Sequence, residues 1–464
     1  MKIGKDSPAK PALSLSKGRQ VLRKFNSIKL CALAGENPRR IGNYTYDETG
    51  HQVSSADREV LSPFRHRDFR IFWAGSMLSG IGSQFTTVAM AWQIYELTNS
   101  PLQIGMLGLA RAIPQTILLL VAGLLADAIN RRKLMMCTQS GLCCVSAALA
   151  LLTFAGKASP HMLYVATVFL AFFTSMEQPS RQSMIPNLVP RQQLPQALAL
   201  QGTQRYVPVI AGPSLAGIVL AVFGPGACYL VDALSWLAML GALASLRAKI
   251  PEGGGWRSVS LRSLREGLRF VRGHGVILPL MMLDFGATFF GNVRGLFPIY
   301  ARDILQVGPR GLGLLYTARA VGSLFAAGAI SVLPPIRRTG RWILIGVTIY
   351  GAATALFAGS EVFWFSVLTL ALCGAGDTIS SILRSTANQL STPDTLRGRM
   401  SSINSIFTSS GPQLGQFESG VVAAWIGTKL SALTGGLATL AVVAMVMGFF
   451  PQVRRFQIQR VKQE

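Results

Sequence analysis

Apolar segments of about 20 residues follow one another along this chain from Phe69 onward, and they limit its fold more than any other feature. A helix of that length spans a bilayer, because it rises about 1.5 Å per residue and the hydrocarbon core is about 30 Å thick. The segments show no alternation of polar and apolar residues, which argues against the strands of a membrane barrel. Only 14% of the residues are charged, against about 25% in soluble domains. We therefore predict an all-α integral membrane protein.

The apolar segments predict twelve transmembrane helices in two sets of six. The first set is expected at residues 69–95, 102–126, 134–155, 161–183, 197–222 and 226–246. The second set is expected at residues 276–300, 311–333, 341–358, 362–385, 400–426 and 429–451. The composition predicts a disordered cytoplasmic tail at 1–62, a bundle at 63–246, a basic amphipathic cytoplasmic linker at 247–275, a bundle at 276–451 and a cytoplasmic tail at 452–464.

The two sets of helices repeat one another. GMLGLARA at Gly105–Ala112 matches GLLYTARA at Gly313–Ala320 at five of eight positions, 208 residues apart. Further matches lie 203 residues apart, pairing Arg181 with Arg384, Pro190 with Pro393, Gly212 with Gly415, and Gly217 with Gly420. Such a repeat predicts two pseudo-symmetric six-helix bundles related by an axis along the membrane normal.

The chain carries a net charge of +24, and its basic residues fall mainly in the loops on one side of the predicted bundles. The loops expected on the opposite side hold Lys157, Arg302, Arg310 and Lys429 as their basic residues. The positive-inside rule then places both termini in the cytoplasm, and we expect the chain in a cytoplasmic membrane with the linker on its anionic leaflet. Because the charge lies in loops between apolar helices, we expect a lipid bilayer and no nucleic acid as a partner.

The loop after the second predicted helix carries the sequence GLLADAINRRK. It resembles the motif G-x-L-A-D-(R/K)-x-G-R-(R/K), which the major facilitator superfamily carries between its second and third helices. The fitting positions are Gly123, Leu125, Ala126, Asp127, Arg131 and Arg132, and the departures are Ala128 and Asn130. The resemblance implies a cytoplasmic gate in which Asp127 helps to latch the two halves. An ordinary positive-inside loop with one acidic residue is the alternative interpretation.

Two further stretches resemble exporters of that superfamily. AGPSLAG at Ala211–Gly217 is similar to the G-P-x-L-G-G stretch of its antiporters, and it makes Gly212, Pro213 and Gly217 a candidate antiporter-like kink. Proline removes a backbone donor and bends a helix, while glycine permits close helix approach, so an ordinary packing kink is the alternative. EQPSRQSMIPNLVP at Glu177–Pro190 resembles the branch of enterobactin exporters and macrolide-efflux proteins, a likeness that extends over residues 63–451.

Ionisable side chains inside the predicted helices are the candidate functional groups, because a charge at mid-membrane costs about 2.5–3.5 kcal/mol. The candidates for proton coupling are Asp284, Glu418, Asp232, Glu177 and Asp377. The candidates for substrate binding or gating are Arg111, Arg319, Arg294 and Gln84. The duplicated Arg111 and Arg319 are equally compatible with structural pairing, with Asp232, Glu418 or backbone carbonyls as partners.

The remaining sequence features favour transport over catalysis. The four histidines lie outside the helix interiors, the six cysteines lack metal-ligand spacing, and no P-loop is present. We expect no enzymatic activity, no metal and no cofactor. The prediction is a monomeric secondary transporter that exports an amphiphilic small molecule, a drug or a siderophore, in exchange for protons by alternating access. An uptake permease of the same fold and a transport-inactive membrane sensor are the alternatives.

The latch assignment predicts that Asp127→Asn impairs transport while the protein still inserts into the membrane. The substitution removes the proposed ionic contact but leaves unchanged the basic residues that fix topology. Flux into vesicles, normalised to the amount of protein in the membrane, checks this. Wild-type flux at a normal membrane level would contradict the latch.

Overall fold

A computed structural model of the chain describes residues 62–128, 131–248, 269, 271–273, 275–333, 336, 338–393 and 396–457. The predicted tail at 1–62 except for its last residue, all but a few residues of the predicted linker at 247–275, and the end of the tail at 452–464 lie outside these residues. Their assignments stay predictions. The described secondary structure is helical throughout.

The described first half of the molecule contains five α-helices and the short 3₁₀ helices η1 (Ser62–Arg65), η2 (Ile185–Asn187) and η3 (Arg191–Gln193). The α-helices are α3 (Arg67–Thr98), α4 (Pro101–Ala128), α5 (Arg131–Phe154), α6 (Pro160–Met184) and α7 (Leu194–Ala244). α7 contains two of the predicted membrane helices, which meet at Gly224. The backbone there has φ 76°, a conformation that glycine adopts readily and that other residues avoid. This bend lies between the predicted helix ends at 222 and 226.

The second half contains the remaining helices. They are α9 (Ile277–Phe290), η4 (Val293–Leu296), α10 (Phe297–Ile299), η5 (Tyr300–Ile304), α11 (Gly308–Val332), α12 (Thr339–Ala358), α13 (Phe363–Leu390), α14 (Arg397–Ile426), α15 (Thr428–Phe449) and α16 (Pro451–Arg455). The prediction of one continuous helix at 276–300 is wrong, because the α-helix ends at Phe290. The Asn292 side chain accepts a hydrogen bond from the backbone N–H of Arg294 (3.2 Å) and caps the following 3₁₀ turn.

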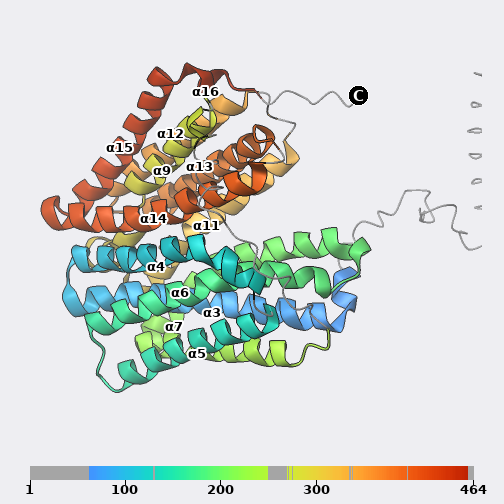
Figure 1. Cartoon of the computed structure of the whole chain (residues 1–464). Helices are drawn as coiled ribbons and strands as arrows, with labels where there is room; N and C mark the ends of the chain where they lie inside the picture. The colour runs from blue at the N-terminus through green and yellow to red at the C-terminus, as the bar shows by residue number, and fades with distance from the viewer. Residues whose placement is uncertain are drawn as a thin grey trace, which may run out of the picture. The chain divides into compact units, whose positions relative to one another are not determined.

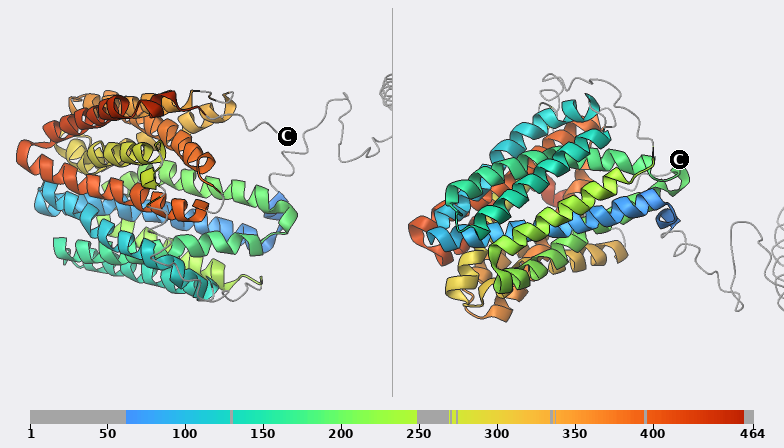
Figure 2. Two further views of the ribbon diagram at one scale, coloured as in Figure 1. Left: turned by 45° about the horizontal axis from the view of Figure 1, so that its top comes forward. Right: turned by 90° about the horizontal axis from the view of Figure 1, so that it is seen from below.

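The helices gather into two bundles, as the repeat predicts. α3 to α7 form one group and α9 to α15 the other, and α4 of the first lies beside α14 of the second (Figures 1 and 2). Six of the described helices are long and apolar enough to cross a membrane, and α7 is one of them. α3, α4, α6 and α14 have between 25 and 32 residues and are also long enough to span. The predicted fold class, twelve transmembrane helices in two pseudo-symmetric bundles, is confirmed.

The two bundles meet at two glycine crossings. Where α7 meets α11, a Cβ atom on Gly217 would lie 2.6 Å from the carbonyl oxygen of Pro309 and 3.1 Å from the Cα of Gly313. Where α14 meets α4, a Cβ atom on Gly420 would lie 2.6 Å from the Cα of Gly105. These are repeated positions, since Gly105 matches Gly313 and Gly217 matches Gly420. The two crossings are therefore equivalent under the pseudo-twofold axis.

The first crossing predicts that Gly217→Leu separates α7 from α11. A leucine side chain does not fit against the backbone of Pro309 and Gly313, so overpacking should destabilise the protein by about 1–3 kcal/mol. We expect a lower thermal unfolding temperature for the purified protein and lost or leaky transport, with the protein still present in the membrane.

Gly202→Leu is the matched control, because Gly202 lies in the same helix and nothing lies within 4 Å of a Cβ atom there. Equal unfolding temperatures and equal flux for both variants would show that the crossing does not hold the halves together.

Candidate functional site

A cavity of about 250 Å³ lies between the two bundles. The first half contributes residues from α3, α4, α6 and α7: Gln84, Thr87, Met90, Ala91, Leu107, Arg111, Thr167 and Val209. The second half contributes residues from the α9–η4 break, η4, α11 and α14: Asn292, Arg294, Tyr316, Pro412, Gln413 and Gln416. Gln84 and Asn292 lie 208 residues apart, so they occupy equivalent positions in the two halves.

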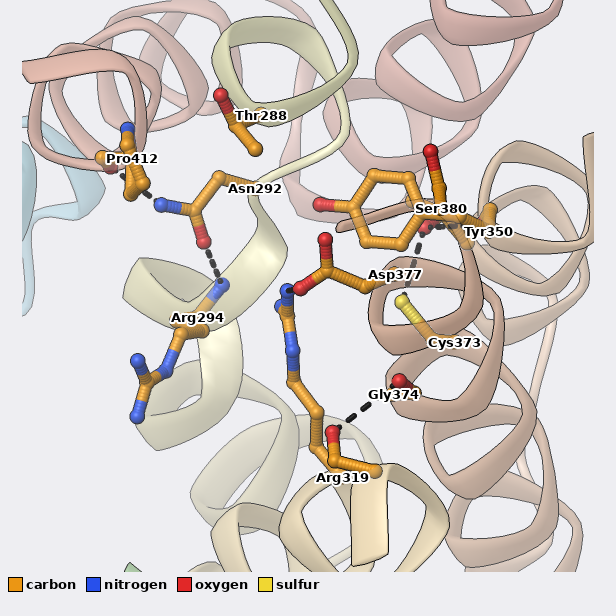
Figure 3. Close-up of polar contacts among 12 residues, drawn as sticks. Thr288, Asn292, Arg294, Arg319, Tyr350, Cys373, Gly374, Asp377, Ser380 and Pro412 are labelled. Atoms are coloured by element: carbon orange, nitrogen blue, oxygen red, sulfur yellow. Dashed lines mark hydrogen bonds and ion pairs between the residues drawn. The ribbon is translucent and has the colours of Figure 1, made fainter. Parts of the chain in front are cut away.

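Two arginines give this cavity its electrostatic character. Arg111 of α4 has no hydrogen bond or ion pair to any residue that the structure describes. Arg294 of η4 lies 5.7 Å from the centre of the Tyr316 ring, a cation–π contact. Figure 3 shows the Arg294 guanidinium pointing away from the ion pair between Arg319 and Asp377. The residues that line the cavity include no aspartate or glutamate.

The break after α9 is what brings Arg294 to the cavity. The Asn292 amide donates to the carbonyl oxygen of Pro412 in α14 while its oxygen caps η4 (Figure 3). The Tyr316 hydroxyl donates to the carbonyl oxygen of Arg294 (3.4 Å). Phe297 packs edge-on against Tyr316, with 5.0 Å between the ring centres. These contacts fix a short turn at the point where an unbroken helix would continue.

The duplicated arginines have different surroundings. Arg319 forms an ion pair with Asp377 (3.1 Å) and lies 5.4 Å from the centre of the Tyr350 ring (Figure 3). The residue 203 positions before Asp377 is Thr174, so the first half offers Arg111 no equivalent carboxylate. Neither arginine pairs with Asp232 or Glu418, the acidic partners considered from the sequence. The structural alternative holds for Arg319, whereas Arg111 opens into the cavity.

Three of the five candidate carboxylates have an arginine partner. Asp284 pairs with Arg384, and both side chains are buried. Glu177 pairs with Arg181 one turn further along α6, and it accepts a hydrogen bond from Gln139 (3.0 Å). Asp377, the third of these carboxylates, pairs with Arg319. Each of these acids is part of an ion pair inside one half of the molecule.

The other two carboxylates have no cationic partner among the described residues. Asp232 is 1% exposed, and one of its oxygens accepts hydrogen bonds from Thr86 (2.6 Å) and Ser146 (2.7 Å). Its other oxygen is buried without a partner. Glu418 of α14 is half-buried and has no hydrogen bond or ion pair in the described part of the chain. Neither residue lines the cavity.

Two arginines of the predicted gate motif form hydrogen bonds within the first half. Arg131 donates to the carbonyl oxygen of Ser183 (3.3 Å) and Arg132 to that of Ala244 (3.0 Å). The surroundings of Gly123 and of the Asp127 side chain lie outside what the structure describes, so the latch stays a prediction.

The predicted kink packs against both its neighbours in the fold. A Cβ atom on Gly212 would lie 2.6 Å from the Gln84 side chain, and the carbonyl group of Pro213 lies against Gly313. Gly217 belongs to the first glycine crossing. The stretch therefore lies where α7 contacts both the cavity-lining helix α3 and the opposite half.

The sequence did not single out the hydrogen bonds that join the two halves near the end of α3. Tyr95, near the end of α3, donates a hydrogen bond to Asp303, and Arg302 donates to Asn99 (2.9 Å). Tyr95 and Asp303 lie 208 residues apart, the same separation as the repeat. That separation was the available signal, because residues at equivalent positions near a twofold axis can touch one another.

A further contact at this end lies within the second half. Lys429 donates to Glu361 in the loop before α13 (2.6 Å), and this hydrogen bond lowers the pKa of the Glu361 carboxyl. Both side chains are exposed, so the pair adds little to stability.

Known proteins resemble this chain over nearly all of the described residues. The enterobactin exporter EntS of Shigella boydii serotype 18 (strain CDC 3083-94 / BS512) is 27% identical over 393 residues, covering 84% of this chain and 94% of that protein. EntS of Escherichia coli O81 (strain ED1a) is 26% identical over the same length and shares.

Solved transporter structures share the fold. A POT family transporter in complex with 5-aminolevulinic acid has a TM-score of 0.68 at 12% identity, covering 83% of this chain and 96% of that one. A bacterial homologue of the iron transporter ferroportin in an inward-facing state has a TM-score of 0.65 at 16% identity, covering 84% and 99%.

The family model described as transmembrane secretion effector matches residues 58–462. The predicted resemblance to the major facilitator superfamily and to its enterobactin-exporter branch is thereby confirmed. The apolar helices and the relatives of this chain show that it is a multi-pass protein of the bacterial inner membrane. The chain belongs to the transmembrane secretion effector family of major facilitator superfamily transporters.

Proposed function

We propose that this protein is a secondary transporter that exports a siderophore-like amphiphilic molecule across the bacterial inner membrane by alternating access. The observation that carries the proposal is the polar cavity between the two bundles, which both halves line and which the glycine crossings flank. Transporters of this architecture bind substrate at the interface of their repeats and rock the repeats around it. The relatives named as enterobactin exporters, matched over 84% of the chain, support export and a siderophore-like substrate.

The contacts between the halves support an inward-facing state. At the end where α3 finishes, the halves are joined by the Tyr95–Asp303 and Arg302–Asn99 hydrogen bonds. Along α11 the last such hydrogen bond is made by Thr317, to the carbonyl oxygen of Ile210 (2.9 Å), and along α4 the last is between Thr116 and Ser410 of α14 (2.9 Å). Between Thr317 and Val332, α11 makes no hydrogen bond to the first half among the described residues.

The end without such hydrogen bonds among the described residues is the side on which the basic loops lie, so we assign it to the cytoplasm, together with both termini. A substrate then enters from the cytoplasm, and the Tyr95–Asp303 contact must break to release it outside. Further parts of the proposal are the monomeric state, protons as the coupling ion and the absence of enzymatic activity.

Flux of iron-free enterobactin in membrane vesicles tests the direction of transport. Energised everted vesicles that contain the protein should accumulate enterobactin above the level of vesicles without it, because their lumen corresponds to the outside of the cell. Accumulation in right-side-out vesicles instead would favour the uptake permease. An absence of flux in both, with protein present, would favour the transport-inactive sensor.

We propose that protons couple through Asp232 or Glu418. Asp284, Glu177 and Asp377 each hold an arginine, and neutralising one of them leaves that arginine unpaired. Asp232 and Glu418 have no cationic partner among the described residues, so a proton binds there without breaking an ion pair. Asp284, Glu177 and Asp377 are the candidates that follow.

Neutral variants separate a coupling role from a structural one. Asp232→Asn or Glu418→Gln should abolish export driven by a pH gradient, while downhill exchange of substrate in proteoliposomes persists because the cavity is unchanged. Asp284→Asn should instead lower stability by about 3–5 kcal/mol, because it leaves Arg384 buried without its partner. Flux with and without an imposed pH gradient, and thermal unfolding of each variant, measure these effects.

Two results would contradict this assignment. Wild-type flux that ignores the pH gradient would exclude proton antiport. Gradient-driven export that survives in both Asp232→Asn and Glu418→Gln would move the coupling site to one of the paired carboxylates.

A further inference from the structure

The cavity holds positive charge that nothing in its wall neutralises. Arg111 has no hydrogen bond or ion pair among the described residues, and the contact of the Arg294 guanidinium is with the face of Tyr316. Among the described residues, no aspartate or glutamate lines the cavity. A desolvated cation without a partner is unfavourable in a membrane protein, and cations at this depth mark substrate or ion pathways.

The rest of the wall suits an organic anion better than a simple ion. Gln84, Gln413 and Gln416 present amide groups that can donate hydrogen bonds, while Met90 and Leu107 provide an apolar surface. The Tyr316 ring also lines the cavity beside Arg294 and adds aromatic surface to the wall. Amide donors around two arginines complement acceptor oxygens, and arginine binds carboxylates through paired, charge-assisted hydrogen bonds.

The contrast with Arg319 shows that pairing is possible in this fold. Arg319 occupies the position in the second half that is equivalent to Arg111, and it forms an ion pair with Asp377 (3.1 Å). Arg111 has Thr174 at the position that corresponds to Asp377. The first half therefore retains an arginine at the same depth without the carboxylate that would make it structural.

We infer that the cavity binds the acidic group of an anionic amphiphile between Arg111 and Arg294. The inference rests on the proposed export function and specifies its substrate class: an aromatic organic acid, as opposed to a neutral or cationic compound. Because Arg111 belongs to the first half and Arg294 to the second, a bound anion contacts both. It offsets the repulsion that two cations facing one cavity exert on each other, and so favours closure of the halves around the substrate.

Binding of three matched probes to the purified transporter tests the inference. 2-Naphthoate, 2-naphthamide and 2-naphthylmethylamine share one ring system and carry a negative, a neutral and a positive group. Thermal unfolding at increasing probe concentration reports binding, since a ligand of the folded state stabilises by mass action. We expect 2-naphthoate to raise the unfolding temperature at concentrations where the amide and the amine do not.

Arginine variants locate the site. Arg111→Gln and Arg294→Gln should each weaken binding of 2-naphthoate by about 10- to 100-fold, as expected for loss of a charge-assisted hydrogen bond. Arg310→Gln is the matched control, because Arg310 is an exposed arginine outside the cavity. Without probe, Arg111→Gln should unfold at a temperature no lower than the wild type, because it removes an unpaired cation; a structural Arg111 would make the variant unfold earlier.

Three outcomes would overturn the inference: stabilisation by the amide or the amine equal to that by the acid, an acid preference that survives in both cavity variants, or no effect of 2-naphthoate up to its solubility limit. The binding measurement is independent of export. Vesicle export of enterobactin without an acid preference would refute the anion site and leave the transporter function intact. An acid preference without export would support the anion site and contradict the proposed export function.

Discussion

The contact on which the structure depends is the approach of glycine to backbone where the bundles cross. Lipid tails are as apolar as leucine, so membrane helices associate through close packing more than through the hydrophobic effect. At Gly217–Gly313 and at Gly105–Gly420 the added Cβ atom would meet backbone atoms, so only glycine permits this distance. Because both crossings come from the same repeated positions, the same glycine contact occurs twice and holds the halves together on either side of the cavity.

The helix packing of the two halves is symmetric, but the residues that line the cavity and join the halves differ between them. The equivalent positions Gln84 and Asn292 both reach the cavity, but only the second lies at a helix break that turns Arg294 inward. Tyr95 and Asp303 are also equivalent positions, and their different side chains let them bond to each other across the halves. A duplication supplies two similar surfaces, and substitution of single residues turns them into a gate and a binding site.

The sequence predicted the parts of this fold that depend on local hydrophobicity. Runs of apolar residues gave the helices, and the bend at Gly224 fell between two predicted ends. The break after Phe290 was not predicted, because Gly291 and Asn292 are tolerated in an apolar run and the break depends on Pro412 and Tyr316, contributed by distant helices. For the same reason the arginines were found but their partners were not: Arg319 and Asp377 are 58 residues apart and meet only through packing of α11 on α13.

The ion pairs distinguish charged groups that have an ionic partner from charged groups that have none among the described residues. In the second half Asp284–Arg384 and Arg319–Asp377 tie α9 and α11 to α13, and a buried pair resists separation because either charge alone would be costly in a low dielectric. The first half keeps Arg111 and Asp232 without ionic partners among the described residues. Unpaired charges are the ones that a substrate or a proton can satisfy without first breaking a bond. Chemistry that changes during a transport cycle should therefore concentrate on these unpaired groups, Glu418 of α14 included, and on the helix break that carries Arg294, while the paired charges of both halves keep their partners throughout.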